Sequence, residues 1–158
     1  YANILAFDGY YEKKWFPYTM PISDIYGLRQ AFDNIKNDPY MLERHAKIGN
    51  AVRAAVKEAG LELYQETGFS NTVTVLNVPE GTTDTAILTA MKEKCNIMLA
   101  GSFGAFAGKV IRIGHMGENA YPEKVGAVMA GLDLVFKDLG ITLKCSLKEA
   151  YDRKMSEQ

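Results

Sequence analysis

Cysteine and histidine are scarce in this sequence of 158 residues. It holds two cysteines, Cys95 and Cys145, and two histidines, His45 and His115, each isolated from the others. There is no CxxC pair and no pair of histidines four residues apart, so we expect no metal site. The two cysteines could form one disulfide, but we expect free thiols in a reducing compartment, which favours a cytoplasmic protein.

The sequence also lacks a long apolar run and an excess of either charge. No stretch approaches the roughly 20 apolar residues that a membrane-spanning helix needs. There are 18 Lys and Arg against 19 Asp and Glu, and no basic stripe is interleaved with aromatic residues. We therefore expect neither nucleic acid nor a membrane surface as a partner. The segment that begins at Tyr1 has no basic stretch followed by an apolar one, so we recognise no signal peptide.

Arrangements typical of nucleophilic or acid–base catalysis are missing too. No Ser/His/Asp or Cys/His set and no pair of carboxylates stands out. The glycine-rich segment 101–108 lacks the GxxxxGK[ST] pattern of a phosphate-binding loop and joins two predicted strands instead of opening a helix. We interpret it as a substrate-side loop or a plain hairpin connection.

Helical periodicity and end signals are what the sequence does contain. Pro21 and Pro122 suit first-turn positions, Ser146 opens a capping box, and Gly60 and Gly140 suit left-handed helix stops. The predicted helices are 21–35, 39–59, 83–94, 122–139 and 146–155.

Short apolar or β-branched segments fall between these helices. They predict strands at 61–64, 72–78, 96–100 and 109–113. The connections between them suit antiparallel pairing. We therefore expect an α+β fold, with a small, mostly antiparallel sheet and helices packed on one face.

The first 20 residues are dense in aromatic side chains, with seven between Tyr1 and Tyr18. So much apolar surface needs something to cover it. We expect residues 1–20 to face another domain or subunit, although such a segment could also fold back on its own core.

Arg112 is the most informative residue of the chain. It lies between Ile111 and Ile113, and strand side chains alternate between faces, so it should point away from both isoleucines. A guanidinium stays charged and is costly to bury without a partner, whereas its planar fork suits a carboxylate. From spacing alone, two interpretations remain open: a surface arginine on a half-exposed strand, or a docking site for a small acid.

Thr19 precedes the first predicted helix. A hydroxyl near a helix start can bind an anion together with backbone N–H groups. It can equally serve as a simple N-cap, which is the commoner use of threonine there.

Taken together, these segments resemble a known family. They are, in order, Phe16-Pro-Tyr-Thr-Met-Pro21, Ile25-Tyr-Gly-Leu-Arg-Gln-Ala-Phe32, Arg44-His45, Ser70-Asn-Thr-Val-Thr74 and Gly108-Lys-Val-Ile-Arg-Ile-Gly-His-Met-Gly117. The whole pattern resembles the C-terminal small domain of class V aminotransferases of the serine–pyruvate / alanine–glyoxylate type. The resemblance covers almost the whole chain.

The resemblance implies a cofactor and two site residues. Family members bind pyridoxal 5′-phosphate as a Schiff base on a lysine of their large domain, and no lysine here sits in that context, so we assign no catalytic residue. Arg112 matches the arginine that holds the substrate α-carboxylate. Thr19 matches the threonine that reaches the cofactor phosphate of the partner subunit. Phe16 falls where some members carry a phosphate-binding tyrosine. His115, Met116 and the loop 101–104 fall on the substrate side.

The resemblance also implies an activity and an organisation. Residues 21–158 would form the aminotransferase small domain, in a homodimeric enzyme that transfers an amino group between an amino acid and a 2-oxo acid. Alone, the chain should be inactive and should not bind pyridoxal 5′-phosphate. Two alternatives are a non-enzymatic module that binds a small acid or peptide, and an interaction domain whose aromatic segment is the active surface.

Overall fold

The computed structural model describes residues 3–157, and its chain divides into two compact units after Pro39. The first unit contains a 3₁₀ turn, η1 (Ile4–Phe7), a single helical turn, α1 (Tyr10–Lys13), and the helix α2 (Ile22–Lys36). The sequence pattern predicted α2 but not the two short turns, which contain too few residues to show a helical period.

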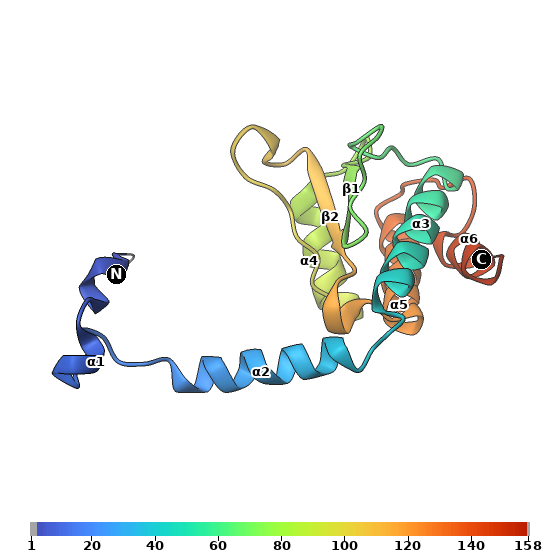
Figure 1. Ribbon diagram of the computed structural model, residues 1–158. Coiled ribbons are helices and arrows are strands. Elements are labelled where there is room, and N and C mark those ends of the chain that lie inside the picture. The colour runs from blue at the N-terminus through green and yellow to red at the C-terminus, as the bar shows by residue number, and fades with distance from the viewer. Residues whose placement is uncertain (1–2, 158) are drawn as a thin grey trace. The chain divides into compact units, whose positions relative to one another are not determined.

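The second unit holds the sheet and four further helices (Figure 1). Their order is α3 (Met41–Glu58), β1 (Val73–Asn77), α4 (Asp84–Cys95), β2 (Val110–Gly114), α5 (Pro122–Asp138) and α6 (Leu147–Ser156), with 3₁₀ turns η2 (Gly104–Phe106) and η3 (Gly117–Asn119) on either side of β2. All five predicted helices are present, and the α+β class is confirmed.

Local signals explain where the helices begin and end. The Thr83 hydroxyl accepts a hydrogen bond from the backbone N–H of Ala86, and the Ser146 hydroxyl accepts one from that of Glu149, so both residues are N-caps and the cap predicted at Ser146 is confirmed. Gly60 and Gly140 follow α3 and α5 with φ of 84° and 74°, a left-handed conformation that glycine adopts without strain.

β1 and β2 form an antiparallel pair in which Val75 lies opposite Arg112. The predicted strands at 61–64 and 96–100 are shorter than expected. Each is reduced to one bridge, Leu63 with Leu76 on one side and Ala100 with Arg112 on the other. An apolar run favours an extended backbone, but the length over which it pairs depends on its neighbours.

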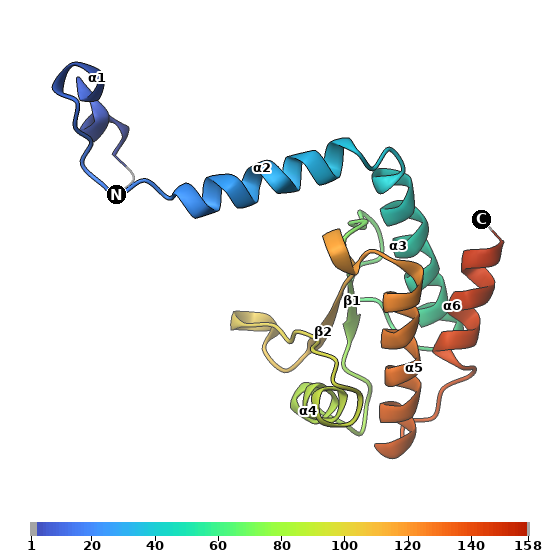
Figure 2. The ribbon, with the colours of Figure 1, turned by 90° about the horizontal axis from the view of Figure 1, so that it is seen from below.

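One face of the sheet is buried against helices. Thr74, Leu76, Ile111 and Ile113 are buried on this face. Seen from below, α3, α5 and α6 lie side by side next to the sheet, while α4 packs against α5 (Figure 2). This core holds the pairing register of β2, and with it the position of Arg112.

The helices approach one another closely where α4 meets α5. A Cβ on Gly131 of α5 would lie 3.0 Å from Met91 Cε and 3.3 Å from Cys95 Sγ, so a larger residue would require these side chains to shift. The packing leaves Cys95 half-buried against α5, and neither Cys95 nor Cys145 is in a disulfide.

Candidate functional site: an arginine at the centre of β2

Arg112 occupies the middle position of β2, and its neighbours in sequence fix its direction. Ile111 and Ile113 are fully buried, whereas Arg112 is half-buried on the opposite face. This is the alternation that the sequence predicted. β1 pairs with one edge of β2. On the other edge, the backbone N–H of Arg112 donates to the Ala100 carbonyl at 2.7 Å.

The guanidinium of Arg112 is anchored at one nitrogen only. Nε donates a hydrogen bond to the Gly101 carbonyl at 2.7 Å. Among residues 3–157, no carboxylate lies within ion-pair distance of Arg112, and its two Nη atoms donate to no side chain or carbonyl. The anchored nitrogen fixes the plane of the group, and the two Nη atoms are left as a pair of donors.

Gly101 is placed by the first turn of α4. A Cβ at this position would lie 3.3 Å from both Asp84 Oδ2 and Leu88 Cδ1. These distances are tighter than most packing contacts, so the absence of a side chain at residue 101 lets the backbone pass close to α4 without displacing either group. No feature of the sequence predicts that a main-chain oxygen of this loop orients Arg112, since any residue carries the same oxygen.

Apolar side chains are exposed on the segments next to Arg112. Met98 precedes its pairing partner Ala100 and is 82% exposed, and Phe103 follows Gly101 and is 79% exposed. Met116, just beyond β2, is also exposed. Large apolar groups clustered on neighbouring segments are typical of a surface that another apolar surface covers.

His115, which follows β2, is fully buried and has partners for both ring nitrogens. Nδ1 lies 3.1 Å from the Asn71 carbonyl and Nε2 lies 2.9 Å from Thr74 Oγ1. Because a carbonyl can only accept, Nδ1 carries the hydrogen, and a neutral ring then accepts from Thr74 at Nε2. Burial lowers the pKa of His115, and the Arg53 cation acts in the same direction, so the ring is held in its neutral form.

His45, in the first turn of α3, holds the turn that follows His115. Its Nδ1 lies 2.7 Å from the Met41 carbonyl, and its Nε2 accepts a hydrogen bond from the Gly117 N–H at 3.1 Å. These partners fix a neutral ring with its hydrogen on Nδ1. Both histidines are therefore structural in this chain, and residues 3–157 contain no cluster of His, Cys, Asp and Glu that could hold a metal.

Thr19, the predicted phosphate contact, belongs to the first unit. It is exposed and lies two residues before Pro21, the N-cap of α2. No side-chain hydrogen bond caps α2, so the alternative interpretation of Thr19 as the N-cap is wrong. A proline carries no side-chain acceptor, and the first N–H groups of α2 are left to other partners.

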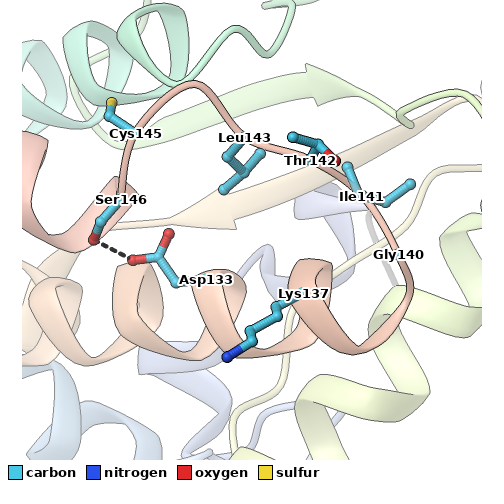
Figure 3. Close-up of a pocket in the computed structure, with 8 residues that line it drawn as sticks. All are labelled: Asp133, Lys137, Gly140, Ile141, Thr142, Leu143, Cys145 and Ser146. Carbon is cyan, nitrogen blue, oxygen red and sulfur yellow. Dashed lines mark hydrogen bonds between the residues drawn. The ribbon is translucent and has the colours of Figure 1, made fainter.

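The best-formed hollows among the described residues are not lined by Arg112. Figure 3 shows one of about 530 Å³ between the end of α5 and the start of α6. Asp133 on its wall accepts hydrogen bonds from Ser146 Oγ at 2.6 Å and from the backbone N–H groups of Leu147 and Lys148 at 2.7 and 3.0 Å. Its carboxylate is thus occupied in capping α6.

The structural comparison defines the class of protein. The fold matches that of pyridoxamine–pyruvate aminotransferase from Mesorhizobium loti with a TM-score of 0.86 and 28% sequence identity, over 98% of this chain and 41% of that one. The chain therefore has the fold of an aminotransferase domain. Within the described residues, no helix is both long and apolar enough to cross a bilayer.

The sequence comparison finds relatives among the aminotransferases. The chain is 37% identical over 148 residues to an uncharacterized aminotransferase of Methanocaldococcus jannaschii, and 36% identical over 130 residues to serine–glyoxylate aminotransferase of Arabidopsis thaliana. These matches cover 91% and 80% of this chain but only 38% and 32% of those proteins. No family model matches. The homologues of this chain are class V aminotransferases, and it corresponds to their C-terminal part alone.

Proposed function

We propose that this chain is the C-terminal substrate-binding domain of a pyridoxal-phosphate-dependent aminotransferase, which transfers an amino group between an amino acid and a 2-oxo acid. The observation that carries the proposal is the state of Arg112: Nε is bound to the Gly101 carbonyl, and both Nη atoms lack a partner among the described residues. Residues 1–20 would face the large domain or the partner subunit, and residues 21–158 would form the small domain.

In this proposal, Arg112 binds the α-carboxylate of both substrates. Amino acids and 2-oxo acids differ at the α-carbon but share this group, so one cation can serve both halves of the reaction. Because Nε already donates to the Gly101 carbonyl, the substrate carboxylate would bind to the two Nη atoms. Its two oxygens would accept two parallel, charge-assisted hydrogen bonds from them. This contact fixes the acid and so orients its α-carbon.

Thr19 fits a contact with the cofactor phosphate. Its hydroxyl is exposed, donates to no described residue, and precedes a 15-residue helix whose first N–H groups lack a side-chain cap. A helix start of this kind favours an anion. We propose that Thr19 contacts the phosphate bound by the partner subunit of a homodimer. Pyridoxal 5′-phosphate, when bound, supplies the electron sink for the reaction.

The test of the proposal is Arg112→Ala in the full-length protein. Loss of two charge-assisted hydrogen bonds should raise KM for the amino acid and the 2-oxo acid about 10- to 100-fold, roughly 1.4–3 kcal/mol. Cofactor content, measured by absorbance, should stay at the wild-type level. Arg112→Lys keeps the charge without the fork and should recover only part of the loss.

A matched control is Arg153→Ala, which removes an exposed arginine of α6 that pairs with Glu58. It should leave both KM values unchanged, because a surface ion pair contributes little. Unchanged substrate affinity in Arg112→Ala would remove Arg112 from the site. A full-length protein that binds small acids but transfers no amino group would favour the alternative of a non-enzymatic binding module.

A further inference from the structure

Two buried polar side chains next to β2, Thr74 and His115, have no place in the proposed chemistry. Thr74 lies in β1 opposite Ile113, and His115 directly follows β2. Both are buried, and their side chains bond to each other at 2.9 Å. Apolar residues of similar size would fill the same space, so the polar pair calls for an explanation beyond packing.

His115 holds the segment that leads into β1 through three hydrogen bonds. Its backbone N–H donates to the Thr72 carbonyl at 2.9 Å, and its ring binds the Asn71 carbonyl and the Thr74 hydroxyl. One residue thus fixes three of four consecutive positions in the opposing chain. The ring also lies close to α3, where a Cβ on Gly49 would be 3.3 Å from its Cε1.

Two further contacts from α3 hold the same region. Arg53 is buried and donates from Nη1 to the Ser70 carbonyl at 2.8 Å. His45 accepts a hydrogen bond from the Gly117 N–H. The segment before β1 and the turn after β2 are therefore both tied to α3, and His115 ties them to each other.

The glycines around His115 explain why such a tie is needed. Gly114 ends β2 and Gly117 begins the turn η3. Neither residue has a side chain to pack, and both add backbone freedom. Met116 between them is exposed. His115 is thus the residue of this turn that is anchored in the core, and it lies three residues from Arg112.

We infer that Thr74 and His115 form a positioning pair for Arg112: their hydrogen bond prevents the end of β2 from fraying and so holds the guanidinium against the Gly101 carbonyl. The inference rests on the proposed function of Arg112. Neither Thr74 nor His115 touches substrate in this account. They act through the pairing register in which Thr74 faces Ile113 and Val75 faces Arg112.

The first test measures Arg112 directly, by the hydrogen exchange of its Nε–H in NMR spectra of the 158-residue chain. Thr74→Val keeps the shape of the side chain and removes the hydroxyl, and it should speed this exchange at least tenfold. Thr74→Ser retains the hydroxyl and should stay within about threefold of wild type. Val135→Ala creates a cavity in α5 and removes no side-chain hydrogen bond, so it controls for general loss of stability.

A second variant guards against poor folding of Thr74→Val. His115→Asn keeps an N–H donor near the position of Nδ1 and removes the acceptor for Thr74, and it should also speed the exchange of Arg112 Nε–H. The exchange rates of Arg112 Nε–H are compared between variants that lose the same number of degrees in thermal midpoint. If neither Thr74→Val nor His115→Asn exchanges faster than Val135→Ala, the inference is overturned.

The second test separates the inference from the proposed function. In the full-length protein, assayed with glyoxylate or pyruvate, whichever the wild type turns over, Thr74→Val should raise KM three- to tenfold. It should add nothing further in the Arg112→Ala background, because the pair acts through Arg112.

A KM effect of Arg112→Ala without any effect of Thr74→Val on KM or exchange would overturn the inference and leave the proposed function intact. Faster exchange in Thr74→Val together with a KM insensitive to Arg112→Ala would support the positioning pair and overturn the proposed function.

Discussion

At the scale of single residues, the role of a polar side chain in this protein depends on how many of its donors and acceptors already form hydrogen bonds within the chain. Asp133 has hydrogen bonds to three groups and serves only as a cap. His115 has both ring nitrogens satisfied and serves the fold. Arg112 has one nitrogen satisfied and two Nη atoms without a partner among residues 3–157, which is what a binding residue needs.

The buried ring of His115 has a consequence for stability against acid. Burial lowers its pKa in the folded chain, so the unfolded chain binds a proton more readily. The free energy of unfolding should therefore fall as pH drops below the ordinary histidine value of 6.5, with a slope of up to about 1.4 kcal/mol per pH unit from this one proton.

Denaturant unfolding at pH 7.5, 6.5 and 5.5 measures this slope. In His115→Asn the chain should be less stable throughout but should lose the part of the slope that His115 contributes. An identical slope in wild type and His115→Asn would show that the pKa of His115 is the same in the folded and the unfolded chain.

Sequence reasoning at this scale found the residue type but not its surroundings. Arg112 was recognisable because an arginine inside an apolar run is unusual, and the family motif around it is distinctive. The loop 101–104 and the segment Ser70–Thr74 were part of the resemblance, but the roles of the Gly101 carbonyl and of the Thr74 hydroxyl were not recognised. A backbone carbonyl leaves no trace in a sequence, and a threonine in a β-branched run is also what strand propensity alone would predict.

At the scale of elements, the capping of α6 shows how a helix depends on its neighbour. The Asp133 carboxylate in α5 accepts hydrogen bonds from two backbone N–H groups of α6 and from the hydroxyl of Ser146, the N-cap of α6. Asp133→Ala should lower the free energy of unfolding by about 1–3 kcal/mol, because these donors lose their acceptor.

Chemical denaturation checks this value. Asp152→Ala is a suitable control, since it removes an aspartate that forms only an exposed ion pair with Lys148 in α6. Its effect should stay within about 0.5 kcal/mol. Equal losses in the two variants would mean that the cap contributes no more than a surface charge.

The apolar stripe of α2 leads to a prediction about association. Ile22, Ile25, Tyr26, Leu28, Phe32 and Ile35 are 47–68% exposed. A helix of this length gains little stability without packing, and a stripe of this kind favours contact with another apolar surface. We expect the 158-residue chain to associate with itself as its concentration rises. The double variant Leu28→Glu, Phe32→Glu should shift this equilibrium toward the monomer.

Sedimentation over a tenfold concentration range tests this expectation. Gln30→Glu with Asn34→Glu adds the same charge to a polar pair of α2, whose side chains bond to each other at 2.9 Å, and should leave association unchanged. A wild-type chain that stays monomeric at every concentration would contradict the prediction.

The elements also show how far local sequence determines structure. The helices were predictable because their stops and caps are local: Gly60, Gly140, Thr83 and Ser146 act on adjacent backbone. The segments 61–64 and 96–100 were predicted as strands and make single bridges. Their pairing length is set by the sheet they join, which local propensity does not describe.

At the scale of the whole molecule, the chain represents a minor part of its relatives. It covers 38% of the Methanocaldococcus jannaschii protein and 32% of the Arabidopsis thaliana enzyme. We expect it to carry the acid-binding arginine but not the lysine that chemistry requires. Pyridoxal 5′-phosphate added to the 158-residue chain should give no stable lysine-linked absorption band and no amino-group transfer.

Absorbance titration and an assay with serine and glyoxylate check this expectation, with the full-length protein as the positive control. A stable band from the 158-residue chain that resists dialysis would show that one of its own lysines binds the cofactor, and the division of labour proposed here would then be wrong.

The bond between Arg112 and Gly101 has an evolutionary consequence. Because the acceptor is the main-chain oxygen of Gly101, the side chains of Ser102 and Phe103 take no part in this bond. Under the proposed function, the side chains at positions 102 and 103 could therefore differ, and with them the surface offered to the substrate side chain, while the arginine that would bind the acid group keeps its orientation.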